Sequence, residues 1–133
     1  NISAHIPESY ISSLPARLGI YKRIAAIRTD EDSSDVIDEL CDRFGEPPKA
    51  VMGLIDIALL RSKAAKAKIY EITANGNTAF LHINSIESEV MSKISAHFGN
   101  RFLLKMADKP VYTVKLNKNQ KLSDFINELS AAL

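Results

Sequence analysis

The chain has 133 residues, of which 46% are hydrophobic and 25% are charged, the composition of an ordinary globular domain. Its 17 basic and 16 acidic side chains give a formal net charge of +1, so no long-range field favours binding to nucleic acid or anionic lipid. The single cysteine, and the lack of any membrane-length apolar run or signal-peptide pattern, fit a cytoplasmic protein outside the membrane.

The first predicted element is a helix from Ser13 to about Arg28, with Pro15 at a first-turn position that proline tolerates. Arg17 and Arg28 fall within its apolar arc, so at least one needs a carboxylate partner, unless its head group reaches water along a buried stem. We expect the helix to be largely covered because its apolar residues form two adjacent stripes, Leu14, Leu18, Tyr21 and Ala25 in one, and Ile20, Ile24 and Ile27 in the other.

Two more helices are predicted in the first half. Thr29 can cap the second helix, which Gly45 ends, and Pro48 begins the third, which ends in a basic turn near Lys66. The expected buried face of the second helix is Val36, Ile37, Leu40, Cys41 and Phe44. From all three helices we expect one core cluster, comprising Leu18, Tyr21, Ile24, Leu40, Phe44, Leu54 and Ile55.

After Lys68 the apolar period changes from 3.6 to 2, which predicts strands. A hairpin is expected around Asn75-Gly76, followed by a helix that Ser85 caps and Gly99 ends. A second hairpin, Phe102 to Met106 and Val111 to Leu116, then leads to a last helix with Ser123 as its cap.

The predicted order is therefore ααα-ββαββα, an α+β fold in which a three-helix part precedes two antiparallel hairpins and their helices. We expect a single domain, residues 1–133, with a helical part over 1–67 and an α+β part over 68–133. The first methionine is Met52, so we expect the sequence to be a piece of a longer protein.

Residues for catalysis, cofactor binding or metal binding are not predicted. The five glycines form no phosphate-binding loop, and His5, His82 and His97 are far apart in the chain. Cys41 lies on the predicted apolar face of its helix, where a thiol behaves as a small hydrophobic side chain.

One charged pattern is distinctive. Asp35, Asp38, Glu39 and Asp42 stand at i, i+3, i+4 and i+7, which places four carboxylates on one face of the second helix. The pattern alone is compatible with a solvated surface or with contact to a basic partner.

Several runs of residues carry a family resemblance, in this order: Ile6 to Ile11, Arg17-Leu18, Tyr21 to Ala25, Glu39 to Gly45 with Pro48, and Leu54 to Arg61. With these landmarks, residues 2 to 70 resemble the C-terminal domain of the bacterial transcription-repair coupling factors, the Mfd family. Beyond Tyr70 only the general plan of an α+β ending is similar, and Cys41 stands where the family more often has an aliphatic residue.

The resemblance implies a regulatory domain at the C-terminus of a multidomain parent. That parent is a helicase-like, ATP-hydrolysing DNA translocase that displaces stalled RNA polymerase and recruits UvrA in transcription-coupled nucleotide excision repair. ATP would bind in motor domains outside this sequence, which itself needs no cofactor. The C-terminal domain would fold onto the UvrA-binding module of the same chain and mask it, an autoinhibitory latch.

Within this family resemblance, Glu39 and Asp42 fall in the most similar run, which favours a contact role for them and for Asp35 and Asp38. An alternative is an accessory nucleic-acid-binding module built on Lys93, Arg101, Lys105, Lys109, Lys115, Lys118 and Lys121, with Tyr112 as a stacking ring. A small hydrolase is a third reading, for which we find no acid and base set. We expect the isolated domain to be a catalytically silent monomer.

Overall fold

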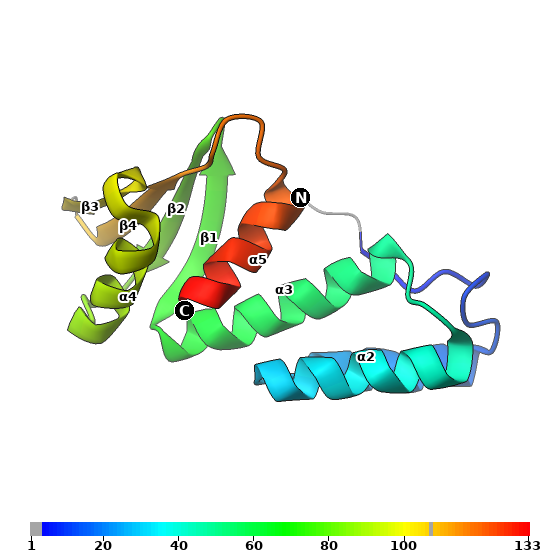
Figure 1. The fold of residues 1–133 in the computed structure, drawn as a ribbon. Coiled ribbons are helices and arrows are strands. Elements are labelled where there is room, and N and C mark those ends of the chain that lie inside the picture. The colour runs from blue at the N-terminus through cyan, green and yellow to red at the C-terminus, as the bar shows by residue number, and fades with distance from the viewer. Residues whose placement is uncertain (1–3, 107) are drawn as a thin grey trace. The chain divides into compact units, whose positions relative to one another are not determined.

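The structure, a computed structural model, describes residues 4–106 and 108–133. Its elements confirm the predicted α+β order (Figure 1): α1 (Leu14–Ala25), α2 (Asp30–Phe44), α3 (Lys49–Lys66), β1 (Ile69–Asn75), β2 (Thr78–Ile83), α4 (Ser88–Phe98), η1 (Gly99–Arg101), β3 (Phe102–Met106), β4 (Pro110–Lys115) and α5 (Leu122–Ala132). Two compact units divide the chain, Asn1–Ser62 and Lys63–Leu133, called here the helical unit and the strand unit. The expectation of a single domain stays a prediction.

The helical unit is built around one apolar cluster from its three helices. Its buried residues are Ile6, Ile11, Ile20, Ile24, Ile27, Val36, Leu40, Val51, Ile55 and Leu59, with Tyr21, Phe44 and Leu54 half-buried against them. Six of the seven predicted core residues therefore belong to one cluster, because each helix directs its i, i+4 apolar positions toward the other two.

The seventh, Leu18, is a wrong prediction. Leu14 and Leu18 are 56% and 52% exposed, whereas Ile20 and Ile24 on the neighbouring stripe of α1 are buried. The core covers the stripe of Ile20, Ile24 and Ile27, whereas on the other stripe Tyr21 packs against the core and Leu14 and Leu18 stay exposed. The helix also ends earlier than predicted, at Ala25, because Ile27 N donates to Ile24 O in a tight final turn.

A narrower apolar arc than expected also corrects the prediction for α2. Val36 and Leu40 are buried, but Cys41, one residue and about 100° further round the helix, is exposed. The predicted ends of α2 are confirmed, with Thr29 as the N-cap and Gly45 at a φ of 86° after the last turn, a conformation that glycine adopts without strain.

The strand unit contains a four-stranded antiparallel sheet in the order β1-β2-β4-β3. Both predicted hairpins are present, and β2 pairs with β4 to join them, with Leu81 opposite Tyr112. Asn75 pairs with Thr78, so the first turn has Gly76, at a φ of 63°, in its first central position, as a type II′ turn requires.

Helices α4 and α5 lie on the same side of this sheet (Figure 1). The rings of Phe98 on α4 and Phe125 on α5 contact each other, with centroids 5.9 Å apart. The buried side chains between helices and sheet are Leu81, Ile83, Ile94, Phe98, Tyr112, Val114, Phe125 and Leu129. This face holds the core of the strand unit.

The predicted caps of these two helices are wrong. Glu87, and not Ser85, precedes the first turn of α4, and Lys121, and not Ser123, precedes that of α5. Ser85 Oγ instead donates to the Glu87 side chain over 3.2 Å. Neither helix has a side-chain cap, which is why the cap rule misplaced both starts.

Candidate interdomain contact surface

The acidic helix α2 begins with a capping box. Thr29 Oγ1 accepts from Asp32 N over 3.1 Å, and Asp32 Oδ2 accepts from Thr29 N over 3.2 Å and from Arg28 N over 2.9 Å. The backbone N–H of Arg28 is the main cause that lowers the pKa of Asp32, and the Thr29 hydrogen bonds add to it. These bonds fix the start of the helix and therefore the direction of the carboxylates that follow.

Glu39, the first predicted contact residue, is held by two arginines of its own unit. Arg23 of α1 donates from Nη1 to Glu39 Oε1, and Arg43, one turn further along α2, donates from Nη1 to Oε2 over 2.9 Å. The hydrogen bond from Arg23, followed by that from Arg43, lowers the pKa of Glu39. Its charge is thus balanced within the helical unit, although 30% of its side chain stays exposed.

The other three predicted contact residues, Asp35, Asp38 and Asp42, are exposed. They lie at i, i+3 and i+7 of α2, and no hydrogen bond or ion pair joins them to other residues within 4–106 and 108–133. These three carboxylates, called here the aspartate face, are free for a basic partner. The structure thus separates the predicted set into one internally paired residue and three unpaired ones.

The C-terminal end of α2 is fastened by Tyr10, which precedes α1. Its hydroxyl donates to Gly45 O over 2.7 Å and to Leu40 O over 3.3 Å, and its ring lies 5.9 Å from that of Phe44. Burial, and secondarily the Cys41 thiol, raises the pKa of Tyr10. The helix that carries the aspartate face is consequently fixed at both ends.

The two arginines of the first apolar arc find different partners. Arg17 donates from Nη1 to the carbonyls of Ile11 and Ser12 over 2.8 and 3.1 Å, and its Nη2 lies 3.7 Å from Glu8 Oε1. Arg28 donates to the carbonyls of Ala25 and Ile27, both over 3.0 Å. The expected carboxylate partner is therefore confirmed for Arg17, while Arg28 caps carbonyls at the end of α1.

The potential metal ligands and the histidines of the described residues lie apart from one another in the fold. Over 4–106 and 108–133, no three His, Cys, Asp or Glu side chains are placed to hold a metal ion. His82 Nε2 lies 3.0 Å from Thr73 Oγ1, and His97 Nε2 lies 3.2 Å from Glu128 Oε2. None of the helices described has the length and apolar character to cross a membrane.

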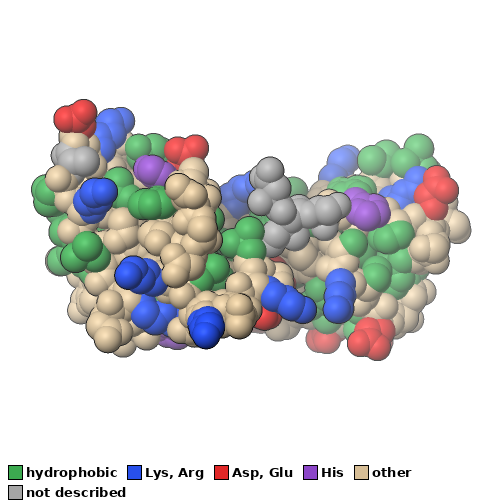
Figure 2. Space-filling model, turned by 90° about the horizontal axis from the view of Figure 1, so that it is seen from above, with side chains coloured by type: hydrophobic (Ala, Val, Ile, Leu, Met, Phe, Trp, Pro, Cys, Tyr) green, Lys and Arg blue, Asp and Glu red, His purple; other side chains and the backbone are tan. Residues whose placement is uncertain are grey.

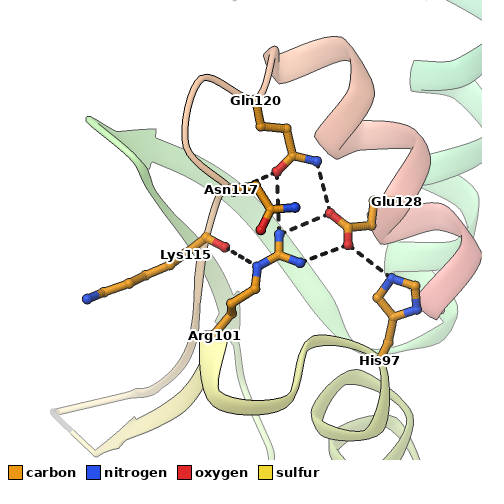
Figure 3. Close-up of polar contacts among 6 residues, drawn as sticks. All are labelled: His97, Arg101, Lys115, Asn117, Gln120 and Glu128. Atoms are coloured by element: carbon orange, nitrogen blue, oxygen red, sulfur yellow. Dashed lines mark hydrogen bonds and ion pairs between the residues drawn. The ribbon is translucent and has the colours of Figure 1, made fainter.

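The nucleic-acid alternative loses two of its named residues. Tyr112 is fully buried under α4 and α5, so it offers no ring for a base to stack on. Arg101 is half-buried and engaged in the polar network shown in Figure 3. The remaining predicted phosphate contacts are exposed lysines. They lie among acidic residues, and Lys93 pairs with Glu89 over 3.5 Å.

Arg101 and Glu128 form the centre of that network, called here the Arg101 network (Figure 3). Arg101 Nη1 and Nη2 donate to Glu128 Oε2 and Oε1 over 2.9 and 3.0 Å, and Nε donates to Lys115 O over 2.9 Å. Gln120 donates to Glu128 Oε1 over 3.0 Å. Arg101, more than any other group, lowers the pKa of Glu128 to about 2. The network ties η1, the end of β4 and α5 together.

Sequence reasoning did not pair the arginines of either cluster with their carboxylates. The pairing of Glu39 with Arg43 had a local signal, since they are four residues apart on one helix. Arg101 and Glu128 are 27 residues apart, and no periodic pattern links them. Only the tertiary fold brings such a pair together.

Comparison with known proteins bears directly on this arrangement. The sequence model of the TRCF domain matches residues 1–94, which include all of the helical unit and the aspartate face. The chain belongs to the TRCF domain family. The match also includes β1, β2 and most of α4, so it extends beyond residues 2 to 70 that carried the resemblance.

Two curated TRCF relatives align with nearly all of the chain. It is 28% identical to the transcription-repair-coupling factor of Staphylococcus aureus (strain NCTC 8325 / PS 47) over 134 residues, which is 97% of this chain and 11% of that protein. The corresponding protein of Bacillus subtilis (strain 168) is 24% identical, over 99% of this chain and 12% of its own length. The chain spans about a tenth of the length of these relatives.

A solved structure supports the same TRCF fold. The crystal structure of the C-terminal domain of a transcription-repair coupling factor matches with a TM-score of 0.86 at 23% identity, over 99% of this chain and 85% of that one. At this identity the likeness shows the fold. It confirms the α+β architecture for both units.

Proposed function

We propose that this chain is the C-terminal regulatory domain of a transcription-repair coupling factor and masks the UvrA-binding module of the same protein. The parent would be the ATP-dependent DNA translocase that engages stalled RNA polymerase and recruits UvrA for nucleotide excision repair. In this proposal the domain contributes no chemistry. Its release from the module shifts the parent from a closed to an open population.

The observation that carries this proposal is that nearly the whole chain aligns with about a tenth of the length of each of two coupling factors. Its fold is also that of the C-terminal domain of such a factor. A short tether between domain and module would give a local concentration of about millimolar, so a weak contact is sufficient to hold the closed state.

We assign the contact to the aspartate face, Asp35, Asp38 and Asp42, with Glu39 in a supporting role. The three aspartates are exposed and unpaired within the described residues, so they can receive arginines of a basic surface as charge-assisted pairs. Glu39 instead holds Arg23 and Arg43. It links α1 to α2 by an exposed ion pair and keeps two cations beside the aspartates, which limits the charge that a partner must supply.

The test is a charge reversal in the full-length coupling factor. Asp38→Lys with Asp42→Lys should open the parent and raise its affinity for UvrA about tenfold or more, because a contact worth about 2–5 kcal/mol when desolvated becomes a repulsion. Isothermal titration of UvrA measures the effect. Both side chains are exposed, so circular dichroism should show a folded protein.

The matched control is Glu89→Lys with Asp124→Lys, two exposed acids on α4 and α5 of the strand unit that give the same change in net charge. This control should leave the UvrA affinity unchanged. Equal affinity of the wild type and the Asp38/Asp42 variant for UvrA would exclude the aspartate face as the contact to the UvrA-binding module. Raised ionic strength should weaken the closed state in the wild type more than in the variant, because the contact is ionic.

A further inference from the structure

The sheet of the strand unit has a second face, opposite α4 and α5. Paired residues of an antiparallel sheet share a face, and the pairings of Thr73 with Phe80, Phe80 with Thr113 and Leu103 with Thr113 therefore define one row across all four strands. The next row is Glu71, His82, Val111 and Lys105. Within the strand unit, no described helix covers these rows, which we call the open face (Figure 1).

The open face carries more apolar side chains than a sheet face that contacts only water. Antiparallel sheets with one buried face normally alternate apolar residues inward and polar residues outward. Here Leu103 and Tyr70 are 65% and 51% exposed, and Phe80 and Val111 are half-buried in the middle of the face. Figure 2, a view from above, shows hydrophobic side chains at the surface of the protein with Lys and Arg side chains among them. These apolar residues extend across the sheet, with Tyr70 on β1, Leu103 on β3 and Phe80 and Val111 on the strands between them, and an apolar patch with a charged rim is typical of a binding surface.

The charges around this apolar row have a definite sign. Lys105 and Lys115 lie on the open face by their register, and Lys109 Nζ lies 5.5 Å from the centroid of the Tyr70 ring. The Tyr70 ring in turn lies 6.1 Å from that of His82. Glu71 is the acid on these strand rows. The rim therefore complements acidic side chains, most strongly at the end that carries Lys105 and Lys109.

We propose that the open face binds an amphipathic α-helix of a protein partner, with its apolar stripe on Leu103, Phe80 and Tyr70 and with acidic flanks facing Lys105 and Lys109. Four strands at ~4.8 Å spacing give a platform about 14 Å wide, which accommodates a helix ~10–12 Å across. Helices already cover the other face of the same sheet. This inference does not depend on the masking of a UvrA-binding module.

A single-stranded nucleic acid fits the open face less well. Base stacking uses exposed aromatic rings; on the open face Tyr70 offers one, already faced by Lys109, whereas Phe80 is half-buried and Tyr112 points into the core. Leu103, the more exposed of the two large apolar side chains named above, is aliphatic. Glu71 and Asp108 also interrupt the three lysines, so these form a local basic site at Lys105 and Lys109 and no continuous basic track for a phosphate backbone.

The experiment selects binders from a displayed library of random 16-residue peptides against the complete 133-residue chain. Leu103→Glu serves as the counter-selection target. Enriched peptides should carry apolar residues at i, i+3 or i+4 and i+7 with Asp or Glu beside them. Synthetic copies should bind the wild type at least tenfold more tightly than Leu103→Glu, and their NMR shift changes should lie in β1 to β4.

Two control variants separate the face from general effects. Lys105→Glu with Lys109→Glu should weaken the binding of the acidic peptides about tenfold. Lys93→Glu should not, because α4 lies on the opposite side of the sheet from the open face. Leu18→Glu, another exposed leucine at 52% but in the helical unit, should leave binding unchanged. Unaltered thermal unfolding of each variant shows that the fold is retained.

Three results would overturn the proposal. The first is a selection in which no sequence distinguishes wild type from Leu103→Glu. The second is enrichment of basic or extended peptides without helical spacing. The third is tighter binding of a dT oligonucleotide than of every selected peptide, lost in Leu103→Glu, which would assign the open face to single-stranded nucleic acid.

Discussion

The two units differ in where they place their ion pairs. In the helical unit, Glu39 pairs with Arg23 and Arg43 at the surface, and its side chain is 30% exposed. In the strand unit, Glu128 receives both Nη atoms of Arg101, with Gln120 and His97 beside it, and its side chain is 21% exposed. The same kind of ion pair thus occurs at a more solvent-exposed position in the helical unit and at a less exposed position in the strand unit.

The difference teaches that an ion pair takes its role from its surroundings. An exposed pair gains little because water screens it, so Glu39 orients neighbouring charges more than it holds the fold. Arg101 joins η1 to the end of β4 and to α5, and its guanidinium lies 5.0 Å from the Phe98 ring centroid. The helical unit should therefore depend on its apolar core, and the strand unit also on a polar network.

The largest effect is expected from the core of the helical unit. Ile24→Ala should lower the free energy of unfolding by about 2–5 kcal/mol, since this buried side chain leaves a cavity. Leu18→Ala on the same helix is the matched control and should change it by less than about 0.5 kcal/mol. Urea unfolding followed by circular dichroism compares the two, and equal losses would contradict the one-sided burial of α1.

Removal of Arg101 should come next. Arg101→Ala leaves the half-buried Glu128 without its bidentate partner and should cost about 2–3 kcal/mol, between the values for exposed and fully buried pairs. Arg61→Ala, a change at an exposed arginine of α3, is the control. The readout is the urea transition of the strand unit, followed by NMR signals of β1 to β4. A loss of unfolding free energy no greater than that of Arg61→Ala would show that the Arg101 network does not stabilise the strand unit.

Acid should weaken the same Arg101 network. The folded-state pKa of Glu128 is about 2, below its ordinary 4.5, so the ionised carboxylate stabilises the folded state. This contribution is complete above about pH 4.5 and is lost as the pH falls toward 2. The stability difference between wild type and Glu128→Gln should therefore be largest at pH 7 and shrink at pH 2.5. A constant difference would show that the charge of Glu128 does not matter.

The smallest effect is expected at the surface pair. Arg23→Ala should leave the urea midpoint nearly unchanged, because Arg23 and Glu39 are both solvent-accessible and Arg43 remains bonded to Glu39. In the full-length parent, however, the variant should alter UvrA affinity by changing the charge beside the aspartate face. A destabilisation as large as that of Arg101→Ala would remove the contrast between the two units.

Periodicity and turn chemistry predicted most of the fold. Thr29, Gly45 and the turn at Gly76 mark element ends through local backbone chemistry, so the sequence alone locates them. Leu18 and Cys41 were misjudged because a helical wheel shows which residues are apolar but not how wide an arc the neighbours cover. The acidic pattern of α2 was visible, whereas the engagement of Glu39 by Arg23 depends on the approach of a second helix.

The segment before α1 sets a limit on how the domain can be shortened. Its described residues, 4–13, form no helix or strand, yet Ile6 and Ile11 are buried, Ile6 N donates to the Tyr21 hydroxyl over 2.8 Å, and Tyr10 reaches the end of α2. A fragment that starts at Leu14 would lose these contacts and free the last turn of the helix that carries Asp42. Residues that look like a linker thus act as a strap, and a domain boundary drawn from secondary structure alone would cut it.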